Sequence, residues 1–500
     1  MAFAFASFAV LAIFGLASSV LIARLYGPST LGKFALALAP TGILMALSSV
    51  REQAALQRRL ALLPPRHPHV TGLAAAVLAF STALTIGMGA LVVGVGSLVL
   101  ANGLHRPDLV LPCIVLAANY ALFQNPSWNL DMVFSSFRAG RELFAVRLHQ
   151  VVAYLIAAIA LAQGSATVWA LVAATALGSI GPLGHRMLLV RRFMYLVPRR
   201  GDLAYGRQEL PELIRWGIRL TPAAAAEGLG KEGATWVLGF LLPVAAVGAY
   251  NRAWLLSARL IDVNYRVTEM LFPTLLERRH AADHQGFDRA LVDSLRYSSA
   301  LMVFPAAIAG GAAVGIMRIF GDGFVGASGA LAWLLIVPAL ITVSAIQGYA
   351  LLSADRVWTV TGIVVTRTIA MLALMVPLVK LDGMTGAAIA LVAGYAADVI
   401  ATGYFASSLR SSPFVLHWPV RGWVGLAAAY GAGFTTSRLI DSNLPDAGGL
   451  ALALAAGSLA YWIALVAVSG LTAADRQRLG ELRRRIRPPR SGVTDLEAPD

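Results

Sequence analysis

Long apolar segments alternate with short polar ones from one end of the chain to the other. Fourteen of them approach or exceed the about 20 residues that a helix needs to cross a bilayer, and strand-type alternation is absent. The expected spans are residues 3–23, 33–50, 70–99, 109–134, 144–163, 168–190, 214–241, 248–271, 297–317, 329–351, 358–379, 385–407, 421–440 and 447–470. The pattern therefore predicts an all-α polytopic membrane protein.

One apolar segment, residues 248–271, carries a stripe of charged side chains. Its arginines recur at every seventh position, at Arg252, Arg259 and Arg266. A step of seven turns a helix by only about 20°, so the three share one face, and they extend over roughly 21 Å of helix axis. Guanidinium groups at that depth must face a water-filled cavity or find partners. Asp262 and Glu269 lie on the same arc, so local ion pairs are the alternative interpretation.

The chain contains a weak internal repeat. The first two spans turn through ARLYGPSTLGKF, and the seventh and eighth turn through LGFLLPVAAVGAY. Pro28 and Gly32 correspond to Pro243 and Gly248, with one extra residue in the second turn. The repeat predicts two six-helix lobes in a V and a final helix pair, with a substrate site between the lobes. The expected divisions are residues 1–213, 214–420, 421–470 and a basic tail at 471–500.

The distribution of positive charge predicts the orientation. If both termini are cytoplasmic, the opposite loops hold only six of the 40 lysines and arginines, seven lie within spans, and 27 lie on the cytoplasmic side. The net charge of +14 is therefore interpreted as a topology signal rather than as a sign of nucleic-acid binding. Residues 2–23 lack a basic n-region and exceed the length of a signal h-region, so they read as the first span. The sequence leaves open whether native residues precede Met1.

Cofactor and metal sites are not expected. A single cysteine excludes an internal disulfide framework, and no metal-ligand spacing or nucleotide-binding loop occurs. Residues 228–233 spell G-x-G-x-x-G, but no strand precedes them and they lie in an Ala-rich span. These glycines are better explained by close helix approach.

Three stretches resemble a known family. LIARLYGPSTLGKFALALAPTGILMALSSVREQAALQRRLA looks like the opening of oligosaccharide flippases of the polysaccharide-biosynthesis transporter type. WVLGFLLPVAAVGAYNRAWLLSARLIDVNYRVTEMLFPTL and IFGDGFVGASGALAWLLIVPALITVSAIQGYALLSADR are similar to later parts of that family. The family lies in the multidrug/oligosaccharidyl-lipid/polysaccharide exporter superfamily, which also includes lipid II flippases.

The resemblance implies two six-helix lobes that rock around a central cavity and flip an isoprenoid-pyrophosphate-linked oligosaccharide. In lipid II flippases, arginines at the end of the first helix, the end of the second and the start of the eighth matter for transport. Arg24, Arg51 and Arg252 occupy comparable places. The chain departs from oligosaccharide flippases at Arg51, where they often have a small residue.

Further polar residues within the spans are candidates for substrate contact or for helix packing. Arg219, Glu227, Lys231 and Glu232 lie in the seventh span, where Glu227 and Lys231 are an i, i+4 pair that could line the cavity or join helices. Asn125 and Asn129 share a face of the fourth span. Their amides suit sugar binding, but interhelical contacts near Pro126 are the favoured interpretation.

Possible ion coupling involves acidic residues within the spans. Glu227, Glu232, Asp262, Glu269 and Asp398 are candidate proton or Na⁺ carriers, and each is equally a counterion for an arginine. Arg367 and Asp398, in neighbouring spans, are expected to form a structural ion pair.

The sequence thus predicts a non-enzymatic flippase of the bacterial inner membrane, with both termini cytoplasmic. Its expected partners are a lipid-linked oligosaccharide, the bilayer and other polysaccharide-assembly proteins, for exopolysaccharide, capsule or O-antigen assembly. The alternatives are a multidrug or cation extruder of the same superfamily, a membrane-embedded glycosyltransferase, polymerase or ligase, and a scaffold of a polysaccharide complex. An arginine stripe disfavours a cation substrate, and short loops disfavour an enzyme.

Overall fold

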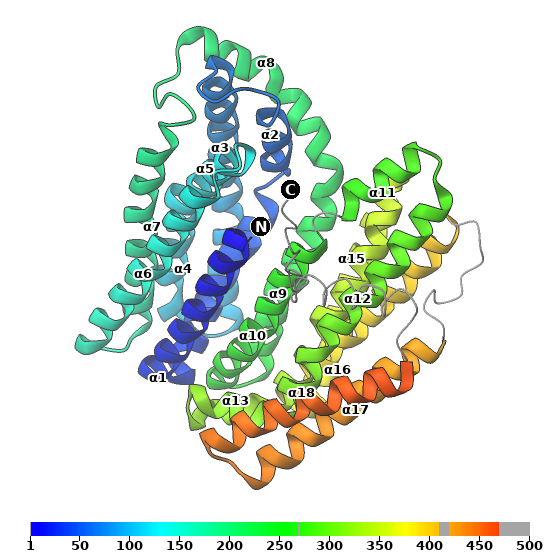
Figure 1. The fold of residues 1–500 in the computed structure, drawn as a ribbon. Coiled ribbons are helices and arrows are strands. Elements are labelled where there is room, and N and C mark those ends of the chain that lie inside the picture. The colour runs from blue at the N-terminus through cyan, green and yellow to red at the C-terminus, as the bar shows by residue number, and fades with distance from the viewer. Residues whose placement is uncertain (1, 269–270, 410–419, 470–500) are drawn as a thin grey trace, which may run out of the picture.

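The computed structural model describes residues 2–268, 271–409 and 420–469, and within these ranges every regular element is a helix. Figure 1 shows two groups of helices that diverge towards one end, with α1, α9 and α10 between them. The first bundle and its connecting helices are α1 (Ala2–Leu47), α2 (Glu52–Leu60), α3 (Pro68–Leu98), α4 (Val110–Asn119), α5 (Asn125–Ser136), α6 (Gly140–Gly164), α7 (Val168–Val190) and α8 (Arg200–Gly217). They account for the first half of the chain.

The second bundle begins at the end of α8. It consists of α9 (Thr221–Leu241), α10 (Val244–Thr268), α11 (Leu271–His280), α12 (His284–Gly311), α13 (Ala313–Phe320), α14 (Ser328–Leu334), α15 (Val337–Ser353) and α16 (Val357–Ser407). A final pair, α17 (Val420–Asn443) and α18 (Ala447–Ser469), packs together and against α12 (Figure 1). Short irregular turns of helix, η1 to η5, join several of these elements.

In the described residues each expected span falls largely on helix, but the count of fourteen membrane spans is not confirmed. Eight helices among the described residues are long and apolar enough to cross a membrane, or nine if α12 and α13, bent by 74°, form one span. Two of the eight, α1 and α16, each merge two expected spans across a kink, at Gly27 and at Asp382–Gly383. Polar and charged residues interrupt α9, α10 and α17, so these helices are not apolar enough to be counted among the eight.

Some expected boundaries were wrong. The fourth span is not one regular helix, because π-helical η3 (Tyr120–Gln124) separates α4 from α5. Pro126 has no N–H to donate to the preceding turn, and such a missing bond favours a local change of helix pitch. The seventh span was expected to begin at residue 214, but α8 continues to Gly217 and a 3₁₀ turn, η4 (Ile218–Leu220), precedes α9.

The packing of buried apolar side chains explains the divergence of the bundles. One large core contains residues from both bundles near Pro28, including Leu31 and Leu36 of α1 and Val247 of α10. At the opposite end, near Arg51, two separate cores occur, one around Leu56 and Leu73 and the other around Leu275. The bundles therefore share a core at what we call the Pro28 end and have cores of their own at the Arg51 end.

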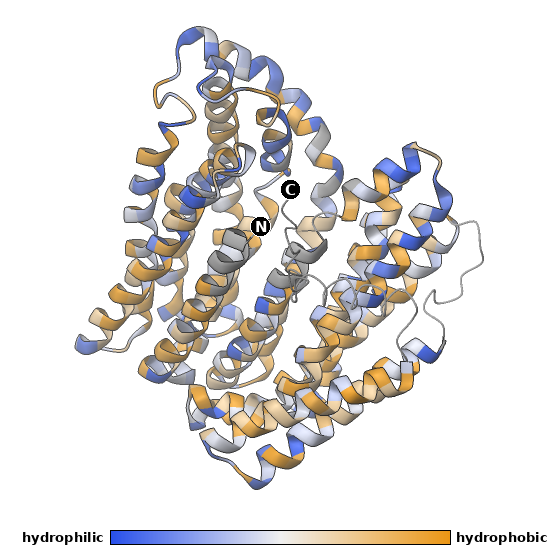
Figure 2. Ribbon diagram, in the orientation of Figure 1, coloured by the Kyte–Doolittle hydropathy of each residue, from blue (hydrophilic) through white to orange (hydrophobic). Residues whose placement is uncertain are grey.

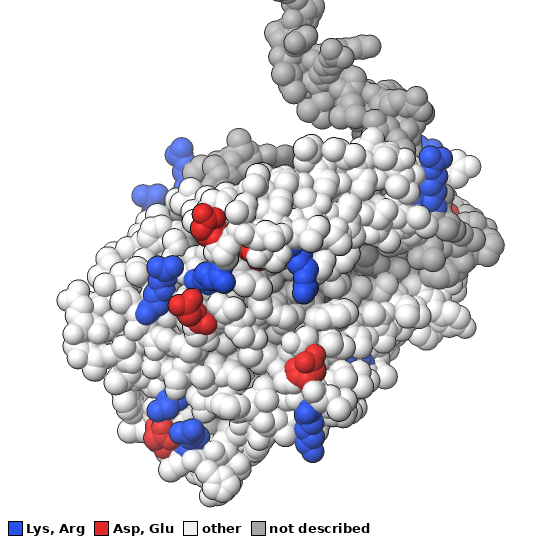
Figure 3. All heavy atoms as spheres, turned by 90° about the horizontal axis from the view of Figure 1, so that it is seen from below, with Lys and Arg blue, Asp and Glu red and all other residues white. Residues whose placement is uncertain are grey.

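Charge and hydropathy differ between the two ends. Figure 2 shows hydrophilic residues gathered at the Arg51 end, on α2, α8 and α11, and largely apolar helix surfaces below them. The face at the Pro28 end carries scattered charges of both signs among uncharged side chains (Figure 3). Large apolar side chains such as Leu91, Ile369 and Ile400 are more than 60% exposed on the helix sides. A lipid environment accounts for that exposure.

Two glycines bring the bundles into backbone contact at the Pro28 end. A Cβ atom on Gly32 would collide with the Val244 carbonyl oxygen, and one on Gly248 would collide with that of Pro28. The turn between the two halves of α1 is made by Gly27, whose φ of 69° favours glycine. These contacts join the two segments of the sequence repeat, and each glycine contacts the turn of the other segment.

We expect Gly248→Ala to destabilise the protein by about 1–3 kcal/mol, because the added methyl group meets main-chain atoms that cannot rotate away. Gly362→Ala is the matched control, since a Cβ on Gly362 would have no neighbour within 4 Å. Thermal unfolding of both variants in detergent checks this. Equal unfolding midpoints for the two would contradict it.

Candidate substrate site between the bundles

Arg252 extends from α10 towards the first bundle. Its Nη1 donates to Ser19 Oγ of α1 at 3.1 Å, and Tyr154 of α6 is close enough to interact with it electrostatically. Its Nε atom is buried and has no hydrogen-bond partner in the described part of the chain. No carboxylate among the described side chains forms an ion pair with Arg252. Within the described part of the chain, no carboxylate therefore compensates the charge of this guanidinium, which lies where the two bundles meet.

Arg259 lies two helical turns further along the same face of α10. Its Nη2 is 3.6 Å from the position that a Cβ of Gly15 would occupy, so this exposed side chain also reaches α1. The side chains of Arg266, Asp262 and Glu269, the other members of the predicted stripe, lie outside the described residues. Two of the three arginines thus reach α1, which packs against α10.

Arg24 lies near the kink of α1 at Gly27, and Arg51 follows the end of α1, so the two have different surroundings. Arg24, at the Pro28 end, is exposed and donates from Nε to the Ile319 carbonyl oxygen of α13 at 2.8 Å, which links the bundles. Arg51 is exposed at the opposite end and has a left-handed backbone with φ 58°. Arg219 is exposed in η4.

The predicted pair of Glu227 and Lys231 is wrong. Glu227 instead binds Arg367 of α16, with Oε2 at 2.9 Å from Nη2, and Lys231 lies 3.4 Å from Glu232. The reason is that α16 packs against α9 and supplies a fixed guanidinium, whereas an i, i+4 contact on a helix surface is weak.

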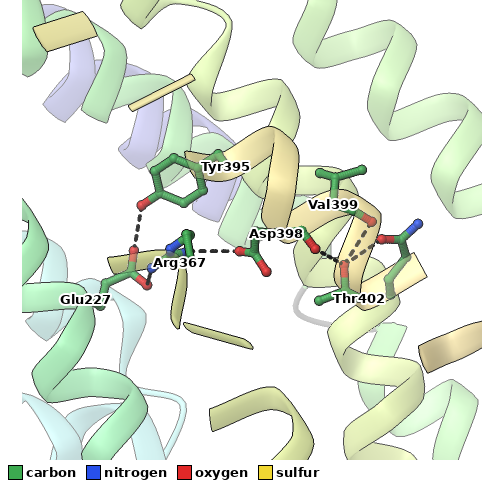
Figure 4. Close-up of polar contacts among 7 residues, drawn as sticks. Glu227, Arg367, Tyr395, Asp398, Val399 and Thr402 are labelled. Atoms are coloured by element: carbon green, nitrogen blue, oxygen red, sulfur yellow. Dashed lines mark hydrogen bonds and ion pairs between the residues drawn. The ribbon is translucent and has the colours of Figure 1, made fainter. Parts of the chain in front are cut away.

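Figure 4 shows the resulting network, in which Arg367 lies between two carboxylates. Its Nη1 donates to Asp398 Oδ2 at 2.9 Å, so the ion pair predicted from the sequence is confirmed. The ring of Tyr395 lies 4.3 Å from the guanidinium carbon, and the Tyr395 hydroxyl donates to Glu227 Oε1. Arg367 and Asp398 are buried, while the Glu227 side chain is 49% exposed. The network joins α9 to both halves of α16.

A second buried ion pair in the first bundle was missed. Arg186 of α7, 1% exposed, donates from Nε to Asp131 Oδ1 at 2.8 Å and from Nη2 to Gln150 of α6. Arg147 lies 3.7 Å from the same carboxylate. The sequence could have predicted this pair. Asp131 and Arg186 are each isolated in an apolar span, and a charged residue in such a span needs a partner.

The fourth-span amides are buried among polar side chains of α3. Asn125 donates to Ser81 and Thr85, and Asn129 donates to Ser81 at 3.0 Å. Both are 3% exposed or less. This arrangement is the interhelical contact favoured from the sequence. Among the described residues, no group of three or more His, Cys, Asp or Glu side chains is arranged to hold a metal ion.

Breaking the buried pair of the second bundle should be costly. We expect Arg367→Ala to reduce stability by about 3–5 kcal/mol, because it leaves the Asp398 carboxylate buried without a cation. Arg278→Ala, which removes the exposed pair with Asp283, should cost about 0–1 kcal/mol. Thermal unfolding in detergent distinguishes the two. If Arg367→Ala unfolded no earlier than Arg278→Ala, the buried pair would not stabilise the bundle.

Comparisons with known proteins agree with this architecture. Residues 75–320 match the model of a family described as polysaccharide biosynthesis protein. The structure is similar to that of the lipid II flippase MurJ in an inward closed conformation, with a TM-score of 0.65 and 13% identity over 93% of this chain and 98% of that one. No curated protein matches the sequence.

Two further solved structures have the same fold. One is an inward-facing multidrug resistance MATE family transporter of the MOP superfamily, with a TM-score of 0.53 and 14% identity over 80% of this chain and 95% of that one. The other is a MOP superfamily transporter from Pyrococcus furiosus, with a TM-score of 0.50 and 14% identity over 82% and 93%. The resemblance seen in the sequence is therefore confirmed: the chain matches the polysaccharide biosynthesis family over residues 75–320 and has the fold of MOP-superfamily transporters.

Proposed function

We propose that the protein flips an isoprenoid-pyrophosphate-linked oligosaccharide across the bacterial inner membrane, for exopolysaccharide, capsule or O-antigen assembly. Both termini are cytoplasmic in this proposal, so the Arg51 end faces the cytoplasm and the Pro28 end faces outwards. The pyrophosphate binds between the bundles at the arginines of α10. The isoprenoid stays in lipid, and rocking of the bundles carries the glycan across.

The observation that supports this most is the uncompensated charge of Arg252. The other deeply placed arginines described above, Arg186 and Arg367, are each held by a carboxylate. Arg252 has only the neutral hydroxyl of Ser19 and a buried Nε without a partner. A phosphate would stabilise such a guanidinium, because it accepts two parallel hydrogen bonds and supplies a negative charge.

Arg259 extends the same cationic face by two turns. Two arginines about 10 Å apart along one helix suit an elongated dianion followed by polar sugars better than a compact monovalent anion. Arg266 continues the seven-residue spacing in the sequence, and we include it in the proposed site although its side chain lies outside the described residues. Asn125 and Asn129 are left out, because both are buried and hydrogen-bonded within the first bundle.

The main alternative, export of a drug or other cation, requires a site of the opposite polarity. The solved transporters of this fold include one named for multidrug resistance and one whose title reports reverse polarity of its binding pocket. The polarity of a site, rather than the fold, therefore indicates the class of substrate. The face of α10 that meets α1 presents arginines, which attract anions and repel cations.

We expect Arg252→Ala and Arg259→Ala each to lower flipping roughly tenfold or more, because each removes a charged hydrogen bond worth about 1.5–3 kcal/mol. The measurement is translocation of a labelled isoprenoid-pyrophosphate oligosaccharide in proteoliposomes. Arg438→Ala is the control, since Arg438 is exposed on α17. Wild-type rates in both α10 variants would remove the stripe from the mechanism, and no flipping by the wild type would favour the extruder or the scaffold.

A further inference from the structure

A buried carboxyl group lies where α1 ends and α2 begins. Glu52, the first residue of α2, is 0% exposed and follows Arg51 with its left-handed backbone. Its Oε2 accepts the Val50 N–H at 2.8 Å and lies 3.4 Å from Ser49 Oγ. Its Oε1 is buried and has no hydrogen-bond partner among the described residues.

Glu52 differs from the acidic residues that the sequence suggested for ion coupling. Glu227 and Asp398 are both held by Arg367, and Glu232 lies beside Lys231. No lysine, arginine or histidine of the described chain forms an ion pair with Glu52. Within the described part of the chain it is therefore a fully buried carboxyl group without an ion-pair partner.

Among the described residues, no basic side chain of the helices packed against α2 forms an ion pair with Glu52. Its neighbours are α3, α5 and α8. Their nearby titratable groups are engaged elsewhere: Asp131 with Arg186, Glu209 with Arg59 of α2 itself, and His69 stacked on Tyr205. Tyr120 of η3 interacts with Glu52 electrostatically, but it is a neutral phenol.

Burial dominates the electrostatics of this carboxyl. It raises the pKa of Glu52, and the hydrogen bonds from Val50 and Ser49 and the charge of exposed Arg51 oppose it only in part. A carboxylate that loses its water without gaining a cation is normally neutralised by a proton.

The position of Glu52 connects this proton to the arrangement of the bundles. Gly217, the last residue of α8 before the 3₁₀ turn that leads into α9, packs so closely that a Cβ there would collide with the Val50 carbonyl oxygen and approach Arg51. The turn that Glu52 fastens is thus the contact between the end of α1 and the entry to the second bundle. A relative motion of the bundles that displaces the end of α8 would alter this turn.

We propose that Glu52 binds one proton in the present arrangement of the bundles and releases it to water when they rearrange at the Arg51 end, so that their equilibrium depends on pH. The proposal rests on the proposed function only in assuming that the bundles move. The buried carboxylic acid becomes a solvated carboxylate, and the proton passes to water. The state that binds the proton more tightly is favoured as pH falls, so acid favours the present arrangement.

Spin labels on Ala61→Cys and Ala281→Cys test the proposal in the full chain without substrate. Both positions are exposed at the Arg51 end, on opposite bundles, and the native Cys113 is buried. Double electron–electron resonance from pH 5 to 9 measures the populations of the separations. One linked proton changes their ratio by at most about tenfold per pH unit. We expect Glu52→Gln, which cannot ionise, to keep the present separation throughout.

Glu209→Gln is the control and should respond to pH like the wild type, because Arg59 already compensates that carboxylate. Glu52→Asp retains a titratable group and should retain a pH response. If Glu52→Gln misfolds, infrared spectroscopy of the Glu52→Asp protein tests the proposal. The C=O stretching band of the protonated carboxyl group should shift relative to the wild-type band. A pH response in Glu52→Gln equal to the wild type, or none in the wild type, would overturn the proposal. Neither result bears on whether Arg252 binds pyrophosphate, which the flipping assay decides separately.

Discussion

The architecture depends on a backbone contact at the Pro28 end. Gly32 and Gly248 each bring their helix against a main-chain carbonyl of the other bundle, and a single methyl group at either position would separate them. One core spans both bundles there, whereas each has its own core at the Arg51 end. The contact therefore sets where the bundles meet, and the positions of α1 and α10 along the site follow from it.

Charge is used in two ways within the membrane. Two buried ion pairs each join helices within a single bundle: Arg186 with Asp131 in the first bundle, and Arg367 with Asp398 in the second. Both pairs have short hydrogen bonds and little exposure. Such pairs cost free energy to bury but are costlier still to break, so they favour rigid bundles that move as units. Arg252 is different because it reaches from one bundle to the other and pairs with no carboxylate among the described side chains. The contrast separates cations that maintain the fold from one that is available to an anion.

Much of the fold was predictable because a membrane-spanning helix requires about 20 consecutive apolar residues, which are visible in the sequence. The reciprocal glycines were visible as a repeat, and the Arg367–Asp398 pair followed from two isolated charges in neighbouring spans. Local polar partners were not predictable: Glu227 was assigned to Lys231, although a guanidinium from α16 outcompetes it. The importance of Glu52 was also hidden, since a glutamate after an apolar span usually reaches water. Only the packing of α2 against α3, α5 and α8 removes that water.

The reciprocal glycine contact has a consequence for diversification. Because main-chain atoms make it, its shape depends on the absence of two side chains and on no particular chemistry. The residues proposed to face the substrate lie elsewhere, on α10 where it meets α1. Substitutions there can alter the charge and size of what is carried while the pivot keeps its geometry. For the proposed function, such a scaffold allows the carried glycan to change while the contact between the bundles is kept.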